Sequence, residues 1–236
     1  MTRRTLNVGS DRFTVGPWHE HPDVAYITVA PSAHQLTNPY AVTQCLEQLG
    51  ELGYRAAVTS ALRGSDAHVF EAAGFVRRER LHVLRHELGN LPPIDRTGAR
   101  LLRRGRRRDR RVVLDVDERA FERFWALGSD GLDEALNATA SVRFRVASDR
   151  DVFGYAVTGR SGEVGYLQRL AVDPVRSGGG IGTALVLDAL HWLRDRHGRF
   201  MLVNTQESNA AALRLYLRLG FNMVDEHLTV LQWPGE

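Results

Sequence analysis

The sequence predicts an α/β protein built on a mixed sheet, with a complete domain in the C-terminal half and a partial, degenerate copy of it in the N-terminal half. Short apolar runs typical of strands alternate with longer runs whose apolar residues recur at helical spacing. A glycine-rich segment joins an apolar strand to a helix at 170–183. The two halves also share an order of elements: the strand-ending prolines Pro31 and Pro174 are 174 − 31 = 143 residues apart, and Gly74 and Gly220 of the Gly-Phe pairs are 220 − 74 = 146 apart. So constant an offset favours duplication.

Composition narrows the classes of protein. The chain has 236 residues, of which 43% are hydrophobic and 25% charged, so it is long and apolar enough to bury a core. Its single cysteine, Cys45, allows no internal disulfide and is expected to be a small buried helix residue in a cytoplasmic protein. No apolar run is long enough for a membrane span, and Met1 leads into no signal-type core. All 31 basic residues are arginine, which excludes a lysine nucleophile.

The N-terminal half, residues 1–88, is expected to be a degenerate half-domain with a structural role. Its expected elements, in chain order, are a strand at 24–29, a helix at 38–52, a strand at 55–60 and a helix that begins near Ser65. The segment 32–38 stands where the other half has its glycine loop, and it contains no glycine. Early strands preceding residue 24 are not expected, so this copy is predicted to be incomplete.

Residues 89–110 are predicted to link the two halves. The segment 89–98 is rich in turn formers, and 103–111 holds seven arginines among nine residues. Such a run suits a contact with RNA or an acidic partner, or a solvated linker kept extended by charge repulsion. No aromatic residues are interleaved for base stacking, so the linker is favoured and nucleic acid is an unlikely partner.

The C-terminal half, residues 111–236, is predicted to be the catalytic domain. Its expected elements are a strand at 111–116, helices at 117–127 and 131–138, a hairpin of strands 142–147 and 152–159, a strand at 165–172, a helix at 181–197, a strand at 200–205, a helix capped by Ser208 or Asn209, and two strands within 221–233. This pattern predicts a mixed sheet with helices on both faces.

The junction at 170–183 favours binding of a diphosphate. A strand, a glycine loop and a helix N-terminus together aim unpaired N–H groups and a helix dipole at one small volume. Glycine lets phosphate oxygens approach the backbone and permits positive φ. The segment contains no Gly-Lys-Ser/Thr, and no G-x-G-x-x-G followed by a ribose-binding acid, so neither common nucleotide motif fits. No His, Cys or carboxylate cluster has metal-ligand spacing either, and no metal is expected.

Two segments together resemble the Gcn5-related N-acetyltransferase (GNAT) superfamily, in a tandem layout like that of mycothiol synthases. The first is Leu170-Ala-Val-Asp-Pro-Val-Arg-Ser-Gly-Gly-Gly-Ile-Gly-Thr183 and the second Asn209-Ala-Ala-Ala-Leu-Arg-Leu-Tyr-Leu-Arg-Leu-Gly-Phe221. The resemblance implies that acetyl-CoA is the co-substrate. It departs from the family pattern at Ser177, where the family has Arg or Gln, and Arg176 lies one place early.

The resemblance also implies roles for individual residues. The cofactor-binding residues it implies are Leu170, Ala171 and Val172 for the pantetheine arm, Arg176, Ser177, Gly178, Gly179, Gly180, Ile181, Gly182 and Thr183 for the pyrophosphate, and Asn209 for the cofactor arm. Tyr216 would protonate the leaving thiolate, although an apolar helix face equally suits a core tyrosine. Tyr216 follows Asn209 by seven residues, so both project from one helix face.

These features favour an acetyl-CoA-dependent N-acetyltransferase that acts directly on a primary amine of a small molecule or a protein N-terminus. Candidates for the acceptor pocket wall are Phe124, Trp125, Tyr166 and Gln168; core packing is the alternative for the first two. The general base stays open between Glu163, Glu207 and an amine that arrives neutral. The competing functions are a non-catalytic acyl-CoA-binding regulator and an RNA- or ribosome-associated module that uses 103–111.

Overall fold

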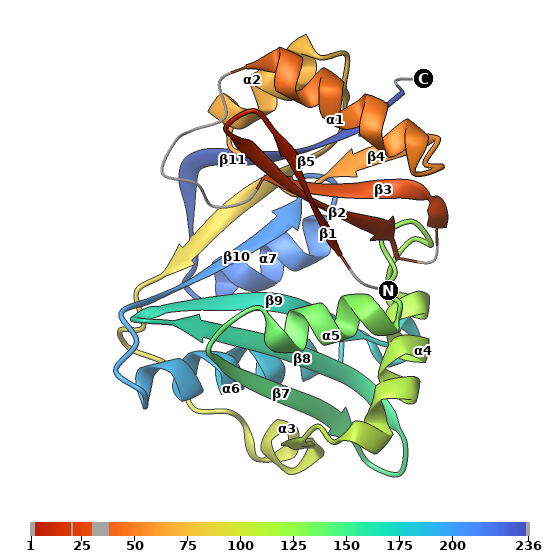
Figure 1. Ribbon diagram of the computed structural model, residues 1–236. Helices are drawn as coiled ribbons and strands as arrows, with labels where there is room; N and C mark the ends of the chain where they lie inside the picture. Colours follow the sequence, from red (N-terminus) through yellow and green to blue (C-terminus); the bar gives the residue numbers. More distant parts are fainter. Residues whose placement is uncertain (1–2, 20, 30–37, 235–236) are drawn as a thin grey trace. The chain divides into compact units, whose positions relative to one another are not determined.

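The computed structural model describes residues 3–19, 21–29 and 38–234 (Figure 1). The chain forms two compact units. The first unit consists of Met1–Val83, Gln206–Ser208 and Asp225–Glu236, and the second unit of Leu84–Thr205 and Asn209–Val224. These boundaries differ from the expected division at 88 and 111, because the chain passes from one unit to the other within three strands. Turn-forming composition marks loops, and it carries no signal for such crossings.

The first unit combines a mixed sheet with two helices. Its elements are β1 (Arg4–Val8), β2 (Asp11–Trp18), β3 (His21–Val29), α1 (Pro39–Glu51), β4 (Ala56–Thr59), α2 (Gly64–Ala72), β5 (Val76–His86) and β11 (Asn222–Trp233). The strand order is β1-β2-β3-β4-β11-β5. Strands β1, β2 and β3 are antiparallel neighbours, whereas β3 and β4 run parallel from the pair Val24–Ala56 to the pair Ile27–Thr59.

Local sequence explains α1. Asn38 accepts a hydrogen bond from the Tyr40 N–H at 2.9 Å, and Pro39 follows at the first helical position, where its missing N–H is harmless. Cys45 lies on the inner face of α1 and is completely buried, as predicted, and burial raises the pKa of its thiol to about 12.

The strands and helices expected between residues 24 and 75 are confirmed, but the prediction that early strands are missing is wrong. Strands β1 and β2 precede β3, and Phe13 and Val15 of β2 are core residues. Gly16 and Pro17 disguise β2 in the sequence, because that pair resembles a turn; the register of β2 shifts beside Pro17. Residues 32–37 belong to the glycine-free segment that stands where the other half has its glycine loop, and they lie outside the described residues.

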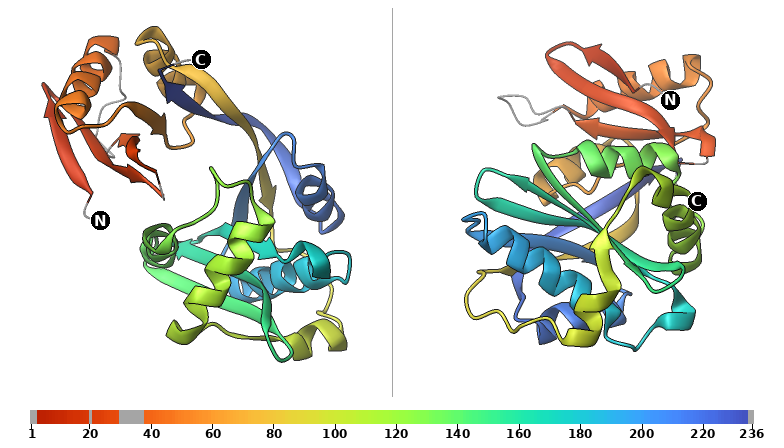
Figure 2. Two further views of the ribbon diagram at one scale, coloured as in Figure 1. Left: turned by 90° about the vertical axis from the view of Figure 1, so that its right-hand side faces the viewer. Right: turned by 90° about the horizontal axis from the view of Figure 1, so that it is seen from below.

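The second unit is the larger. Its elements are α3 (Arg96–Leu101), β6 (Leu102–Arg104), the 3-10 turn η1 (Arg107–Asp109), α4 (Arg110–Ala120), α5 (Ser129–Asn137), β7 (Ser141–Ser148), β8 (Val152–Ser161), β9 (Val164–Val172), η2 (Pro174–Arg176), α6 (Ile181–Arg194), β10 (Phe200–Gln206) and α7 (Ala210–Arg218). The strand order is β10-β9-β8-β7-β6. Helix α6 packs on one face in a buried cluster, and α4 and α5 pack on the other in a second cluster (Figure 2). The predicted mixed sheet with helices on both faces is confirmed here.

The elements expected in three segments are wrong in type, extent or number. The segment 111–116 is helical and lies in α4, where Val113 and Val116 are buried while Val112 is exposed. The buried residues recur at a helical spacing that a short apolar run does not reveal. Helix α4 ends at Ala120, short of the predicted 127, and the two strands expected within 221–233 are one strand, β11.

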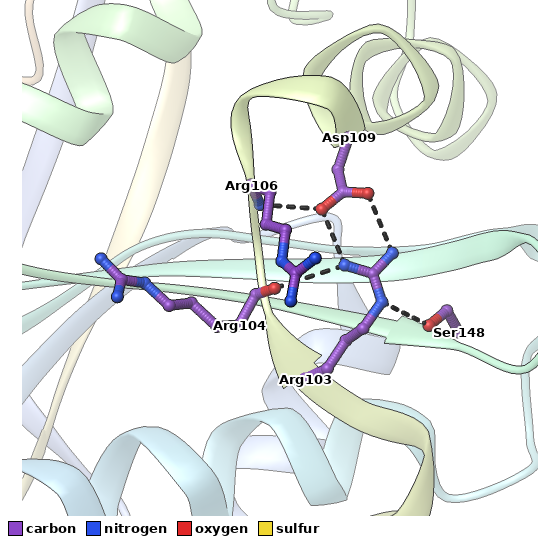
Figure 3. Close-up of polar contacts among 5 residues, drawn as sticks. All are labelled: Arg103, Arg104, Arg106, Asp109 and Ser148. Atoms are coloured by element: carbon purple, nitrogen blue, oxygen red, sulfur yellow. Dashed lines mark hydrogen bonds and ion pairs between the residues drawn. The ribbon is translucent and has the colours of Figure 1, made fainter.

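The arginine run is folded, and it is not an extended linker. It forms β6, η1 and the start of α4. The Arg103 guanidinium donates to both carboxylate oxygens of Asp109, at 2.7 and 2.9 Å, and to the Ser148 hydroxyl at 2.9 Å (Figure 3). The Arg103 hydrogen bonds hold the pKa of Asp109 below its usual value. One aspartate inside the run, itself almost completely buried, thus organises this segment.

No helix in the described part of the chain combines the length and apolar character that crossing a bilayer requires.

Candidate active site

Strands β9 and β10 separate partway along their length. They pair in parallel only from Phe200–Val164 to Leu202–Tyr166. Strand β9 continues to Val172 with its other edge still paired to β8, while β10 continues to Gln206. Beyond Tyr166, the main-chain groups on the edge of β9 that faces β10 therefore have no hydrogen-bond partner on β10. An extended ligand with amide groups binds such a strand edge by main-chain hydrogen bonds.

The glycine loop connects the end of β9 to α6. Gly178 and Gly180 have φ values of +83° and +78°, in the left-handed region that favours glycine, and a Cβ on either would meet open space. The Ala184 N–H donates to the Gly180 carbonyl at 3.0 Å, and this is the first helical hydrogen bond of α6. Among the described residues, no side chain caps α6. The first N–H groups of α6 and its helix dipole are therefore suited to an anion.

Two residues predicted to face the pyrophosphate have other roles for their side chains. The Ile181 side chain is buried in the cluster under α6. A Cβ on Gly182 would lie 3.2 Å from Leu215 Cδ2, so glycine at this position lets α6 approach α7. Only the backbone N–H groups of these residues are available to a phosphate.

Polar contacts secure the loop at its start. Asp173 accepts from the Val175 N–H at 3.1 Å and pairs with Arg119 of α4 at 2.8 Å. The backbone bond and then Arg119 lower the pKa of Asp173. Arg176 pairs with Asp149 at 3.5 Å, and its guanidinium lies 5.0 Å from the Phe153 ring centroid. Such an exposed ion pair contributes little, so Arg176 is free to exchange it for a phosphate.

Helix α7 carries the other two predicted groups. Asn209 is its N-cap and accepts from the Ala212 N–H at 3.0 Å, which confirms one of the two expected caps. Tyr216 is only 5% exposed, and burial raises the pKa of its phenol. It belongs to the same buried cluster as Leu167 of β9 and Val203 of β10, the first residues beyond the last β9–β10 pair. Tyr216 thus lies in the core of the second unit, in the same cluster as these two strand residues.

Gln168 is the extra residue of a β-bulge. Val157 of β8 pairs with Arg169 and Thr158 pairs with Leu167, so Gln168 has no partner in the ladder. A Cβ on Gly159 would come within 2.3 Å of Gln168 Nε2, which shows how closely the amide lies over β8. Its Oε1 atom is buried without a hydrogen-bond partner among the described residues. An acceptor that is buried and unused is suited to a ligand's donor.

The other candidates for the acceptor pocket wall lie on two separate parts of the second unit. Tyr166 is 37% exposed on β9 at the last β9–β10 pair. Phe124 and Trp125 lie in the segment between α4 and α5 with their rings edge-to-face at 5.0 Å. The Trp125 carbonyl accepts from Arg169 of β9 at 2.8 Å, so this segment is bonded to the candidate cofactor strand.

A buried ion pair that sequence reasoning missed holds α4 against β9. Asp117 is fully buried and receives two hydrogen bonds from the Arg169 guanidinium, at 2.8 and 2.7 Å. The Tyr155 hydroxyl and the Leu127 N–H also donate to this carboxylate. Burial of the Tyr155 phenol and then the negative charge of Asp117 raise the pKa of this phenol well above its usual value. Asp117 and Arg169 are 52 residues apart, so nothing in the sequence pairs them.

Asp117→Asn is expected to destabilise the protein by about 3–5 kcal/mol, because it leaves the Arg169 guanidinium buried without a counter-charge. Asp133→Asn is the matched control: Asp133 pairs with Arg110, but both side chains are more than a third exposed. That change should cost about 0–1 kcal/mol. Urea unfolding of the full chain measures both, and equal losses would contradict the structural role given to Asp117.

The two glutamates suggested as general base lie in different units of the chain. Glu163 precedes β9 at the end opposite the glycine loop, and a strand of nine residues at about 3.3 Å each separates them by roughly 26–30 Å. Glu207 belongs to the first unit and pairs with Arg80 at 3.3 Å. The general base stays open between Glu163, Glu207 and an amine that arrives in its neutral form.

The second unit is thus an α/β domain in which two parted strands precede a glycine loop at the start of α6. The description "Acetyltransferase (GNAT) family" matches residues 107–221. Residues 107–221, just under half of the chain, thus form a domain of the GNAT acetyltransferase family.

Individual relatives of the chain are also acetyltransferases by name. The chain is 46% identical to the mycothiol acetyltransferase of Salinispora tropica over 70 residues, 29% of this chain and 22% of that protein. It is 32% identical to that of Actinosynnema mirum over 163 residues, 63% of this chain and 54% of the relative. The alignments thus span well under two thirds of these relatives' lengths. The fold resembles a tandem GNAT protein from the clavulanic acid biosynthesis pathway, with a TM-score of 0.66 at 10% identity over 96% of this chain and 80% of that one.

Proposed function

We propose that this protein is an acetyl-CoA-dependent N-acetyltransferase that transfers the acetyl group directly to a primary amine. The observation that carries the proposal is the parting of β9 and β10 immediately before the uncapped glycine loop. In this proposal the free inner edge of β9 at Leu170, Ala171 and Val172 bonds the pantetheine arm. The backbone N–H groups of Gly178–Thr183, together with Arg176 released from Asp149, hold the pyrophosphate.

The residues around the parted strands would then share the chemistry. A β9 N–H near the bulge polarises the thioester carbonyl as the amine nitrogen attacks its carbon. When the carbon–sulfur bond breaks, Tyr216 donates its proton to the leaving thiolate and later recovers one from solvent. The attacking nitrogen, which becomes positively charged when it bonds to the carbonyl carbon, releases its extra proton to water, so the products are the neutral amide and the CoA thiol. No cysteine other than Cys45 exists, and Cys45 lies in the first unit's core, so no thiol carries the acetyl group.

The acceptor site would lie beside Gln168 and Tyr166. The buried Oε1 atom of Gln168 is positioned to accept a hydrogen bond from an incoming amine. Both a small molecule and a protein N-terminus fit this chemistry. The relatives' name makes an amine related to mycothiol the first acceptor to test. The first unit would serve as a silent copy.

Initial-rate kinetics test the proposal. Release of free CoA thiol is measured with acetyl-CoA and a panel of primary amines, and direct transfer predicts intersecting double-reciprocal lines. Parallel lines would indicate a covalent carrier and contradict direct transfer. Calorimetry with acetyl-CoA and desulfo-CoA provides the control: binding of both without turnover of any amine would favour the acyl-CoA-binding regulator instead.

A further inference from the structure

Three potential metal ligands meet in the first unit: His82, Glu207 and His227. Glu207 Oε1 lies 4.0 Å from His82 Nδ1 and 3.6 Å from His227 Nδ1. All three ligand atoms lie within 4.8 Å of one another. The two imidazole rings are tilted against each other, with centroids 5.6 Å apart. The sequence analysis predicts no metal because no such residues recur at metal-ligand spacing, and these three come together only in the fold.

The fold explains why the sequence does not reveal the cluster. His82 lies on β5 and His227 on the neighbouring strand β11, whereas Glu207 directly follows β10. The Glu207 N–H donates to the Arg80 carbonyl at 3.0 Å, which fixes Glu207 beside β5 two residues from His82. The ligands come from three separate parts of the chain, so they have none of the short spacings by which metal motifs are recognised.

The imidazole nitrogens lack the partners that buried polar atoms normally have. Both His82 Nδ1 and His227 Nδ1 are buried without a hydrogen bond among the described residues. Their distances to Glu207 are beyond hydrogen-bond range. A ligand that binds all three atoms at once would satisfy both nitrogens and the carboxylate.

We propose that this cluster binds a divalent transition-metal ion, with Zn²⁺ as the best match. Two imidazole nitrogens and one carboxylate oxygen form a set that Zn²⁺ prefers, and a fourth position stays open to water or another ligand. Bond lengths of about 2.0–2.1 Å place tetrahedral ligand atoms about 3.3–3.4 Å apart. The two measured separations from Glu207 exceed that spacing by less than about 1 Å, so small side-chain rotations close the site.

Arg80 opposes the metal and provides a specific test. Its Nε atom lies 3.3 Å from Glu207 Oε1, so its positive charge competes with the cation for this carboxylate. The Arg80 side chain is 43% exposed, and it is free to move into water when a metal binds. Removing this charge should therefore strengthen metal binding, which a purely structural role for the cluster does not predict.

Titration of the chelator-treated full chain with Co²⁺, followed by its visible absorption, tests the proposal. One Co²⁺ per chain should bind with absorption bands typical of a low-coordinate site, and Zn²⁺ should displace it. Glu207→Gln keeps the shape of the side chain and should weaken binding at least tenfold, as should His82→Gln and His227→Gln. His68→Gln, at an exposed histidine of the same unit, should leave binding unchanged.

Arg80→Gln should bind Co²⁺ several-fold more tightly than wild type. Circular dichroism shows whether each variant is folded. If a histidine variant unfolds, the Co²⁺ affinities of Glu207→Gln and Arg80→Gln test the metal site without it. The proposal is overturned if the wild-type chain binds no stoichiometric metal, or if Glu207→Gln binds as well as the wild type. Equal affinity of Arg80→Gln and wild type would place the metal elsewhere and would also overturn it.

Discussion

Tyr216→Phe is expected to lower kcat by about 10²–10⁴-fold, while the affinity for acetyl-CoA stays close to that of the wild type. The substitution removes only the phenol oxygen and keeps the ring that packs 5.5 Å from the Phe221 ring centroid. The core under α7 should therefore survive, and only the proton donor is lost. Initial rates at saturating substrates, together with calorimetric affinity for acetyl-CoA, separate the two effects.

The pH profile gives this prediction a second readout. Burial raises the pKa of Tyr216 above its usual 10.0, so the phenol keeps its proton throughout the neutral and moderately alkaline range. Loss of this proton should cause no fall in kcat below about pH 10. A wild-type alkaline limb below that pH must belong to another group and should persist in Tyr216→Phe. An unchanged kcat in the variant would leave Tyr216 as a core residue and make water the proton source.

Gly180→Asp is expected to weaken acetyl-CoA binding by at least about 100-fold, close to 2.7 kcal/mol. Gly180 is the N-cap of α6, and the new carboxylate would occupy the open space at the helix N-terminus. There it would repel the pyrophosphate and take the backbone N–H groups that the phosphate oxygens need. Isothermal titration of the folded variant measures the loss.

Gly162→Asp is the matched control for backbone strain and added charge. Gly162 has a positive φ of +57°, and a Cβ there also meets open space, but it lies in the turn between β8 and β9. Its affinity for acetyl-CoA should equal that of the wild type. If Gly180→Asp also retained wild-type affinity, the glycine loop would not be the pyrophosphate site.

Local signals in the sequence were sufficient for much of the second unit. The hairpin of β7 and β8, the strand β9, the start of α6 and the Asn209 cap each depend on residues within one short segment. The early strands of the first unit were missed because Gly16 and Pro17 resemble a turn. The segment 111–116 of α4 resembles a strand in the sequence because its apolar residues have no clear period over six positions.

The features that depend on distant residues could not be predicted. Asp117 meets Arg169 across 52 positions, and Arg103 of the apparent linker donates to Ser148 across 45 positions. The β-bulge at Gln168 depends on register with β8, which no local pattern encodes. Likewise, unit boundaries fall within β5, β10 and β11, and no local sequence pattern marks a boundary inside a strand. Tertiary pairing decides each of these cases.

A crystal structure of the full chain with acetyl-CoA tests the central claim most directly. We expect one cofactor per chain, with its pyrophosphate at the backbone N–H groups of Gly178–Thr183 and its pantetheine arm along β9 beyond Tyr166. The Tyr216 hydroxyl should lie within hydrogen-bond distance of the thioester sulfur. A cofactor bound in the first unit, or a pyrophosphate held away from the glycine loop, would contradict the account.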